Sequence, residues 1–324
     1  AIPDASVYLP PVTPSQTTIA AQKGLKSEAL RAALDQALRG RLDDLQRLLA
    51  RHGGMPSPTP NFELGAAFGA EIAGQKRDVT KVLNLLAATR ADAEMADVFL
   101  PIAAAYGWVA LIHTSPDNPV AWEALHEFLA DDRAPVRLGV QDAFVRLCGH
   151  PDQSTGLLTQ ALQWMDEEGH KPQYDVAALI VQIFGNKTIL GNLADKALLQ
   201  KFLSRVLAAI ANAPRSAARW DSFRRLLAVL PRSIAVCVAS GGSSSQPAQA
   251  VQAWLKNECI IAEETPVRDV LSQAIVQLRA PALGQATNVI DALRAALARG
   301  TKPPRDPTRV HPGQGRGKRS RQIR

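Results

Sequence analysis

The sequence predicts an all-α protein. From residue 27 to about residue 300, apolar residues recur at steps of three and four, the spacing that places side chains on one face of a helix. Alternation at every second position, which is typical of a half-buried strand, nowhere runs longer than Ile234 to Val238. Hydrophobic residues make up 46% of the 324 residues. A chain of this length exceeds one compact domain, so we expect two domains or an extended repeat array.

Composition divides the chain into three parts. Residues 1–26 carry several prolines among serine and threonine and show no period, so we expect an irregular N-terminal arm. Residues 27–300 form the predicted helical domain. Residues 301–324 hold eight basic residues and one acidic residue, so this tail accounts for the whole net charge of +7 and the body is neutral. The tail has almost no apolar side chains to bury, and we expect it to be disordered.

The helical segments follow one another, and a short stretch of helix-breaking residues ends each of them. The first has one face of leucines between Leu30 and Leu48 and ends at Gly53-Gly54. Asp78 precedes the next segment and can cap its free N–H groups. The apolar run from Val98 to Ile112 has 15 residues, whereas a spanning helix needs about 20, so we predict a buried helix and no membrane span. Later helices are predicted where the period restarts, at Val120, Val136, Leu158, Val176, Leu199, Phe223, Val251, Val267 and Leu283.

Proline marks an internal repeat in the second half of this domain. Four prolines stand near the start of the second of two helical segments, where a missing N–H is harmless. Residues 135–147 align without a gap to residues 266–278, and six of the thirteen positions are identical. The acidic pairs Asp131-Asp132 and Glu263-Glu264 precede the two aligned stretches. The four prolines, which are 37, 42 and 52 residues apart, are Pro135, Pro172, Pro214 and Pro266.

With its Pro-Val-Arg openings after acidic turns, the sequence resembles the HEAT-repeat family, whose two-helix repeats of about 40–47 residues stack into superhelices. The resemblance is clearest for residues 117–300. It implies a right-handed superhelical stack of helical hairpins, a HEAT/ARM-like α-solenoid. It also implies a ladder between neighbouring repeats, in which Asp131 or Asp132 pairs with Arg137, and Glu263 or Glu264 pairs with Arg268. An architecture of this kind does not by itself imply an activity.

Searches for catalytic and metal-binding patterns find no site. No two of the six histidines are three or four residues apart, so a helical metal site is unsupported. His126-Glu127 begins an H-E-x-x-H match, but Ala130 takes the position of the second histidine. Residues 313–320 resemble a phosphate-binding loop but lack its first glycine and its final serine or threonine. We therefore predict no catalytic residue, no metal and no cofactor.

The cysteines indicate the compartment. Cys148, Cys237 and Cys259 lie far apart among apolar neighbours, without the spacing of a metal site or a disulfide framework. We predict that they are core residues of a cytoplasmic protein.

Two features that suggest nucleic-acid binding have simpler explanations. A helix predicted after Pro214 carries Arg215, Arg219, Arg224 and Arg225, but at about 100° per residue these arginines spread around the helix. A binding stripe should lie on one side, so solvated or inter-repeat arginines are the favoured interpretation. The five tryptophans are favoured as core residues over a base-stacking surface.

The basic tail has the most direct physical consequence. A flexible cationic segment attracts polyanions because binding releases their counterions. The alternative is a tail that only aids solubility. The residues expected to contact nucleic acid or another polyanion are Arg309, Arg316, Lys318, Arg319, Arg321 and Arg324.

Two functions fit these observations. The first is a non-enzymatic α-solenoid scaffold that binds a protein partner on its concave face, with non-specific polyanion contacts from the tail. The second is a HEAT-like nucleic-acid enzyme, such as a DNA glycosylase for alkylated bases, which the resemblance brings into consideration. Enzymes of that kind need a positive concave surface around an acidic and aromatic centre. The neutral body favours the scaffold.

Overall fold

The computed structural model describes residues 28–57, 59–149, 151–166, 174–193, 195–240, 246–280, 283, 285 and 287–299. Regular structure in these residues is helical, and none of them lies in a β-strand, which confirms the predicted all-α class. The arm at 1–26, the tail at 301–324 and both predicted boundaries of the helical domain lie outside the described residues.

The N-terminal helices surround one long buried helix. A helix over residues 28–37 precedes α2 (Asp43–His52), α3 (Phe62–Ala73), α4 (Thr80–Ala87), the 3₁₀ turn η1 (Ala96–Val98) and α5 (Phe99–Thr114). α2, α3 and α4 all pack against α5. The side chain of Asp78 accepts from the N–H of Thr80 at 2.9 Å, as predicted for a cap at the start of α4.

The leucine face predicted between Leu30 and Leu48 is divided between two helices. Gly40 has a φ of 93°, a left-handed conformation that glycine accepts without the steric cost of a side chain. The chain turns there, and a second helix begins at Asp43. The apolar pattern is confirmed, because Leu30, Leu34 and Leu45 are buried, but the single continuous helix was wrong.

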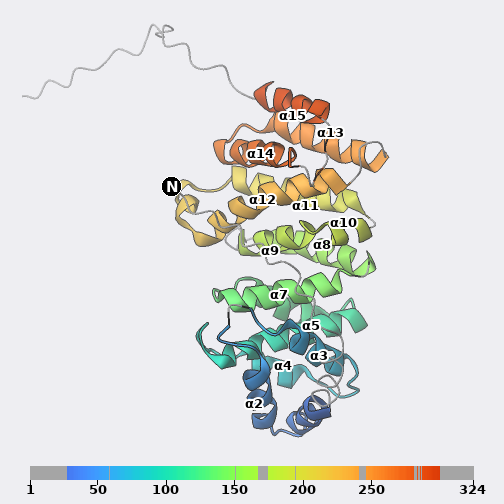
Figure 1. The fold of residues 1–324 in the computed structure, drawn as a ribbon, viewed down its shortest axis with the longest axis vertical. Helices are drawn as coiled ribbons and strands as arrows, with labels where there is room; N and C mark the ends of the chain where they lie inside the picture. The colour runs from blue at the N-terminus through green and yellow to red at the C-terminus, as the bar shows by residue number, and fades with distance from the viewer. Residues whose placement is uncertain are drawn as a thin grey trace, which may run out of the picture.

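From residue 119 onward the helices lie in two rows, which Figure 1 shows stacked along the long axis with α2–α4 at one end and α15 at the other. One row continues from α5 through α7 (Ala134–Leu147), α9 (Tyr174–Phe184), α12 (Asp221–Ser240) and α14 (Thr265–Gln277), each packed on the next. The other holds α6 (Pro119–Leu129), α8 (Pro151–Asp166), α11 (Lys196–Ala211), α13 (Gln246–Ile261) and α15 (Thr287–Arg299). α10 (Lys187–Asn192) and η2 (Arg215–Arg219) are short connections. These packed helices are compatible with a helical-repeat architecture.

Aromatic side chains join helices of the second row. The ring of Trp164 in α8 stacks on His126 of α6 at a centroid distance of 4.8 Å and meets Trp122 edge-on at 6.0 Å. Farther along, Trp254 Nε1 in α13 donates to Ser204 Oγ of α11 at 2.8 Å. The core assignment of the tryptophans is confirmed for the three that are buried, Trp108, Trp122 and Trp164.

Two glycines allow close approach at the start of the first row. A Cβ added to Gly65 in α3 would lie 2.4 Å from the ring of Tyr106 in α5, and one added to Gly139 in α7 would lie 2.4 Å from Ile102. These distances are far below van der Waals contact, so the backbones of α3, α5 and α7 approach this closely only because no side chain stands between them.

A polar chain crosses the same three helices. The Tyr106 hydroxyl of α5 donates to Asp142 of α7. Arg146, one turn later, donates to Asp142 at 2.7 Å and to Glu63 of α3 at 2.9 Å. Burial raises the pKa of Tyr106, and its bond to Asp142 raises it further. The hydroxyl therefore stays a neutral donor, and the network fixes the relative positions of three helices.

The shared apolar positions of the two aligned repeats are buried as predicted. Phe144 and Leu278 are 0% exposed, Ile275 is 1% exposed and Leu147 is 3% exposed. Among the described residues, one helix, Ala96–Thr114, is long and apolar enough to cross a membrane, and 72% of its most apolar window is buried inside the protein. This burial agrees with the buried helix predicted from Val98.

The prolines confirm two helix starts and correct one. Pro135 and Pro266 each lie at the second position of a helix. Pro214 instead precedes η2, and the next helix begins only at Asp221. The single helix predicted after Pro214 was wrong, because the extended backbone of Trp220 separates η2 from α12. α12 begins at Asp221, whose acidic side chain favours a helix N-terminus. Pro172 lies outside the described residues.

The three cysteines are free and buried, which confirms their core assignment. Burial is the main cause that raises the pKa of each thiol to about 12. Because the thiolate is the reactive form, we expect iodoacetamide at about pH 8 to modify the folded protein at least about a hundredfold more slowly than the protein in denaturant. Mass spectrometry measures both rates. A cysteine that reacts equally fast in both states would contradict its burial.

Candidate functional site

The two best-matched repeats share a hydrogen bond as well as a sequence pattern. Arg137 Nη1 donates to the main-chain carbonyl of Asp131 at 2.7 Å, and Arg268 Nη1 donates to that of Ala262 at 3.0 Å. Both carbonyls stand six residues before their arginine, so the preceding turn is held in the same way. Arg268 Nη2 also donates to the carbonyl of Leu297 at 2.6 Å, which links α14 to α15.

The hydrogen bonds of these two arginines go to main-chain carbonyl oxygens, and the charges of Asp131 and Asp132 also act on the guanidinium of Arg137. The ladder that the resemblance implies stays a prediction. The carboxylate of Asp131 is bound by Arg133, at 3.0 Å from Nε and 2.6 Å from Nη2. The remaining members of the implied ladder, Asp132, Glu263 and Glu264, are exposed.

A charged contact between neighbouring helices does occur in the first row. Arg225 of α12 forms an ion pair with Asp175 of α9. Arg137 of α7 lies in the electrostatic field of both, and burial and then the charge of Arg225 lower the pKa of Arg137. This link uses residues that the sequence pattern did not pair, because Arg225 and Asp175 lie outside the two aligned stretches.

Arg133 fastens the loop after α4 to the turn before α7. Its Nη1 donates to the carbonyls of Thr89 and Ala91, both at 3.1 Å, while Nε and Nη2 hold Asp131. The ion pair is shielded, with the two side chains 15% and 9% exposed. The bonds to Asp131 raise the pKa of Arg133, so the guanidinium stays charged. This clamp forms one wall of a cavity.

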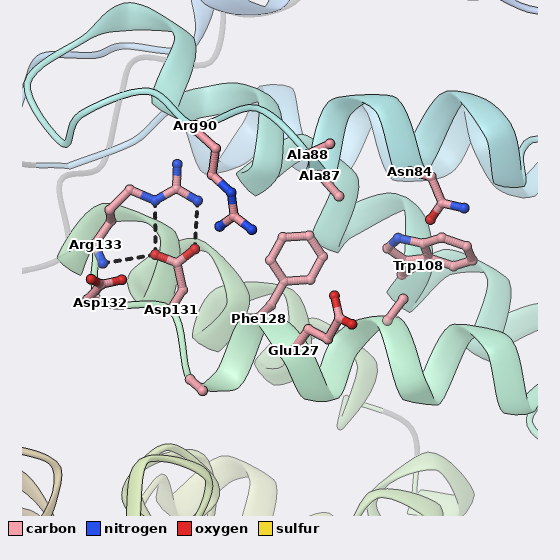
Figure 2. Close-up of a pocket in the computed structure, with 12 residues that line it drawn as sticks. Asn84, Ala87, Ala88, Arg90, Trp108, Glu127, Phe128, Asp131, Asp132 and Arg133 are labelled. Atoms are coloured by element: carbon pink, nitrogen blue, oxygen red, sulfur yellow. Dashed lines mark hydrogen bonds and ion pairs between the residues drawn. The ribbon is translucent and has the colours of Figure 1, made fainter.

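The cavity lies between α4, α5 and α6 and has a volume of about 350 Å³ (Figure 2). Its inner wall includes Trp108 of α5 and Phe128 of α6, which are 0% and 6% exposed. Among the described residues, the buried Trp108 Nε1 has no hydrogen-bond partner. Figure 2 shows this nitrogen on the side of the indole turned toward Phe128 and the cavity. A buried donor without an acceptor lowers the stability of the folded protein by about 1–3 kcal/mol. The indole N–H of Trp108 is therefore a hydrogen-bond donor that a ligand could satisfy.

Exposed charged and polar side chains form the rim of the cavity. Glu127 of α6 and Asp132 lie on one side, and Arg90 and Asn84 lie on the other. Within the described part of the chain, the side chains of Arg90 and Glu127 make no hydrogen bond or ion pair. The rim therefore combines donors and a free carboxylate around a buried N–H.

Acidic residues gather in the segment that carries this rim. From residue 91 to residue 132 the chain has eight acidic residues and no lysine or arginine. All but Asp131 are exposed, and we call the exposed seven the acidic surface. They are Asp92, Glu94, Asp97, Asp117, Glu123, Glu127 and Asp132.

The basic residues of the body gather elsewhere. From residue 187 to residue 232 there are nine lysines and arginines and only two acidic residues, Asp195 and Asp221. A sum over the body hides this separation because the two groups cancel. A running sum along the sequence detects it, because the neutral body contains two oppositely charged segments.

The tail residues Arg309, Arg316, Lys318, Arg319, Arg321 and Arg324, predicted to bind polyanions, lie outside the described residues. Among the described residues, no group of three or more His, Cys, Asp or Glu side chains is arranged to hold a metal ion.

Comparisons with known proteins give no relative. No family model, curated protein or solved structure matches the chain.

Proposed function

We propose that this protein is a non-enzymatic α-solenoid scaffold of the HEAT type, a right-handed superhelical stack of helical hairpins, that binds a protein partner. The two rows of helices support the stack. The carbonyl contacts made alike by Arg137 and Arg268 support repetition of one structural unit. A curved stack exposes a long face, which suits an extended partner better than a small substrate.

The acidic surface is the observation that carries the choice of partner. Like charges in a segment without lysine or arginine repel one another. A partner rich in lysine and arginine relieves this repulsion, and complementary charge speeds encounter and rejects wrong partners. We therefore infer that the partner presents a basic segment.

The tail provides a second, separate contact in this proposal. Its eight cations bind the phosphates of nucleic acid or another polyanion without reading sequence. The tail and the acidic surface have opposite charge, so they recruit different molecules, and the scaffold brings the two together.

The alternative, a HEAT-like DNA glycosylase, is less well supported. The cavity does combine aromatic and acidic side chains, but stacking on a base needs an open ring face, and the rings of Trp108 and Phe128 pack in the core, 0% and 6% exposed. The acidic surface around the cavity repels phosphates. The basic residues between 187 and 232 are not part of its lining.

Neutralising part of the acidic surface tests the proposed function. We expect Asp92→Asn, Glu94→Gln, Glu123→Gln and Asp132→Asn together to abolish most capture of basic proteins from nuclease-treated lysate, because the counter-charge is lost. Quantitative mass spectrometry of proteins retained on the immobilised full chain measures this loss.

The matched control neutralises four exposed carboxylates elsewhere: Asp152→Asn, Glu264→Gln, Asp269→Asn and Asp291→Asn. This control variant should retain the captured proteins, and higher salt should release them. If both variants retain the same proteins in equal amounts, the acidic surface is not the partner site.

A further inference from the structure

We propose that the cavity between α4, α5 and α6 anchors a lysine or arginine residue of the protein partner. A main-chain carbonyl at that residue accepts from Trp108 Nε1, and the cationic side chain pairs with Glu127 at the rim. The inference rests on the proposed function, because it names the chemical group that the partner brings to this site.

The donor is fixed before any ligand arrives. Trp108 is 0% exposed, so the surrounding core holds the indole in one orientation. Its Nε1–H is buried, has no partner in the part of the chain that the structure describes, and faces the cavity (Figure 2). Because this nitrogen is itself buried, a carbonyl oxygen reaches it only when the side chains that cover it move aside. The hydrogen bond formed then relieves the desolvation of the N–H.

The acidic residues select the charge of the ligand. Asp131 is already occupied by Arg133, which leaves Glu127 and Asp132 as the available carboxylates of the lining. These two carboxylates outnumber Arg90, the one cation without an ion pair among the described residues of the lining, so a neutral peptide carbonyl is favoured over a carboxylate or phosphate as the acceptor for Trp108. They attract an ammonium or guanidinium group, and the acidic surface adds to that attraction.

The remaining rim groups indicate an extended peptide rather than a free amino acid. Asn84 and Arg90 stand at the mouth of the cavity and provide donors for carbonyls on either side of the anchored residue. A volume of about 350 Å³ lies at the small end of ligand pockets, so the cavity has room for one residue of the partner. The partner is thus held by one inserted residue within a segment of extended chain.

The test is a titration of the full chain, labelled with ¹⁵N at tryptophan, with a capped hexapeptide that has two central lysines. We expect the indole resonance of Trp108 to shift, while the resonances of the other four tryptophans stay in place. The Trp108 resonance is assigned by elimination, from variants in which each of the other four is replaced by phenylalanine. The assignment therefore does not depend on the folding of a Trp108 variant.

Two matched substitutions on α6 distinguish binding inside the cavity from attraction by the acidic surface as a whole. Glu127→Gln should weaken binding of the hexapeptide about tenfold, the effect of losing a charge-assisted hydrogen bond. Glu123→Gln removes a carboxylate one turn earlier that is also exposed but does not line the cavity, and it should change the affinity by less than about twofold. Equal effects of the two substitutions would overturn the proposal.

Ligand variants give the remaining outcomes. A hexapeptide with norleucine in place of both lysines should leave the Trp108 resonance unchanged. A shift caused by free lysine but not by the capped hexapeptide would overturn the proposal in favour of an amino-acid site. An unshifted Trp108 resonance with bound hexapeptide would overturn the cavity as the anchor. If capture of basic proteins still depends on the acidic surface in either case, the proposed function stands and only this inference fails.

Discussion

Removal of residues 301–324 is expected to abolish most binding of the protein to random duplex DNA while leaving its thermal midpoint unchanged. The whole net charge of +7 belongs to this segment, and non-specific affinity follows the number of phosphates neutralised, with a logarithmic salt slope of about −0.9 per duplex phosphate. With six or more of the eight cations engaged, the full chain loses at least about a thousandfold in affinity between about 50 and 200 mM salt. Fluorescence anisotropy measures the affinity, and differential scanning calorimetry measures the midpoint.

The control for this deletion is a tail of the same length and composition in scrambled order. It should restore DNA binding with the same salt slope, because the contact depends on charge and not on sequence. If the truncated protein binds DNA as tightly as the full chain, the tail does not contribute to DNA binding. The basic residues between 187 and 232 would then be the place to search for the contact.

Helix content was predictable because each helix repeats a local pattern many times. The Gly40 turn and the late start of α12 at Asp221 were missed for a common reason. An apolar period continues through a short break whenever both flanking helices face the same core. Only the backbone angles of Gly40 and Trp220 show that the helix is interrupted.

The candidate site was harder to predict from the sequence, because its residues come from three helices, α4, α5 and α6, that share no common sequence pattern. Nothing local distinguishes Trp108 from the other buried tryptophans, since its unpaired Nε1 is a property of what surrounds it. The acidic surface was detectable, but a charge total taken over the body cancelled it against the basic segment. The aligned Arg137 and Arg268 were found by sequence, whereas their carbonyl partners depend on the shape of the preceding turn.

Truncation of Leu278 to alanine is expected to lower the free energy of unfolding by about 2–5 kcal/mol, through lost burial and the cavity left behind. Leu278 is 0% exposed, and Leu147, its counterpart in the aligned repeat, is 3% exposed. Because the two occupy the same position in a repeated unit, Leu147→Ala should cost a similar amount. Denaturant unfolding followed by circular dichroism gives both values.

A third leucine provides the matched control for these two truncations. Leu138 lies in the same aligned stretch as Leu147 but is 43% exposed, so Leu138→Ala should change the free energy of unfolding by no more than about 0.5 kcal/mol. The contrast separates burial from residue type, since all three substitutions replace leucine with alanine. If the three costs are equal, or if Leu147→Ala and Leu278→Ala both cost nothing, the alignment of residues 135–147 with 266–278 does not describe a structural repeat, and the solenoid proposal loses its main internal support.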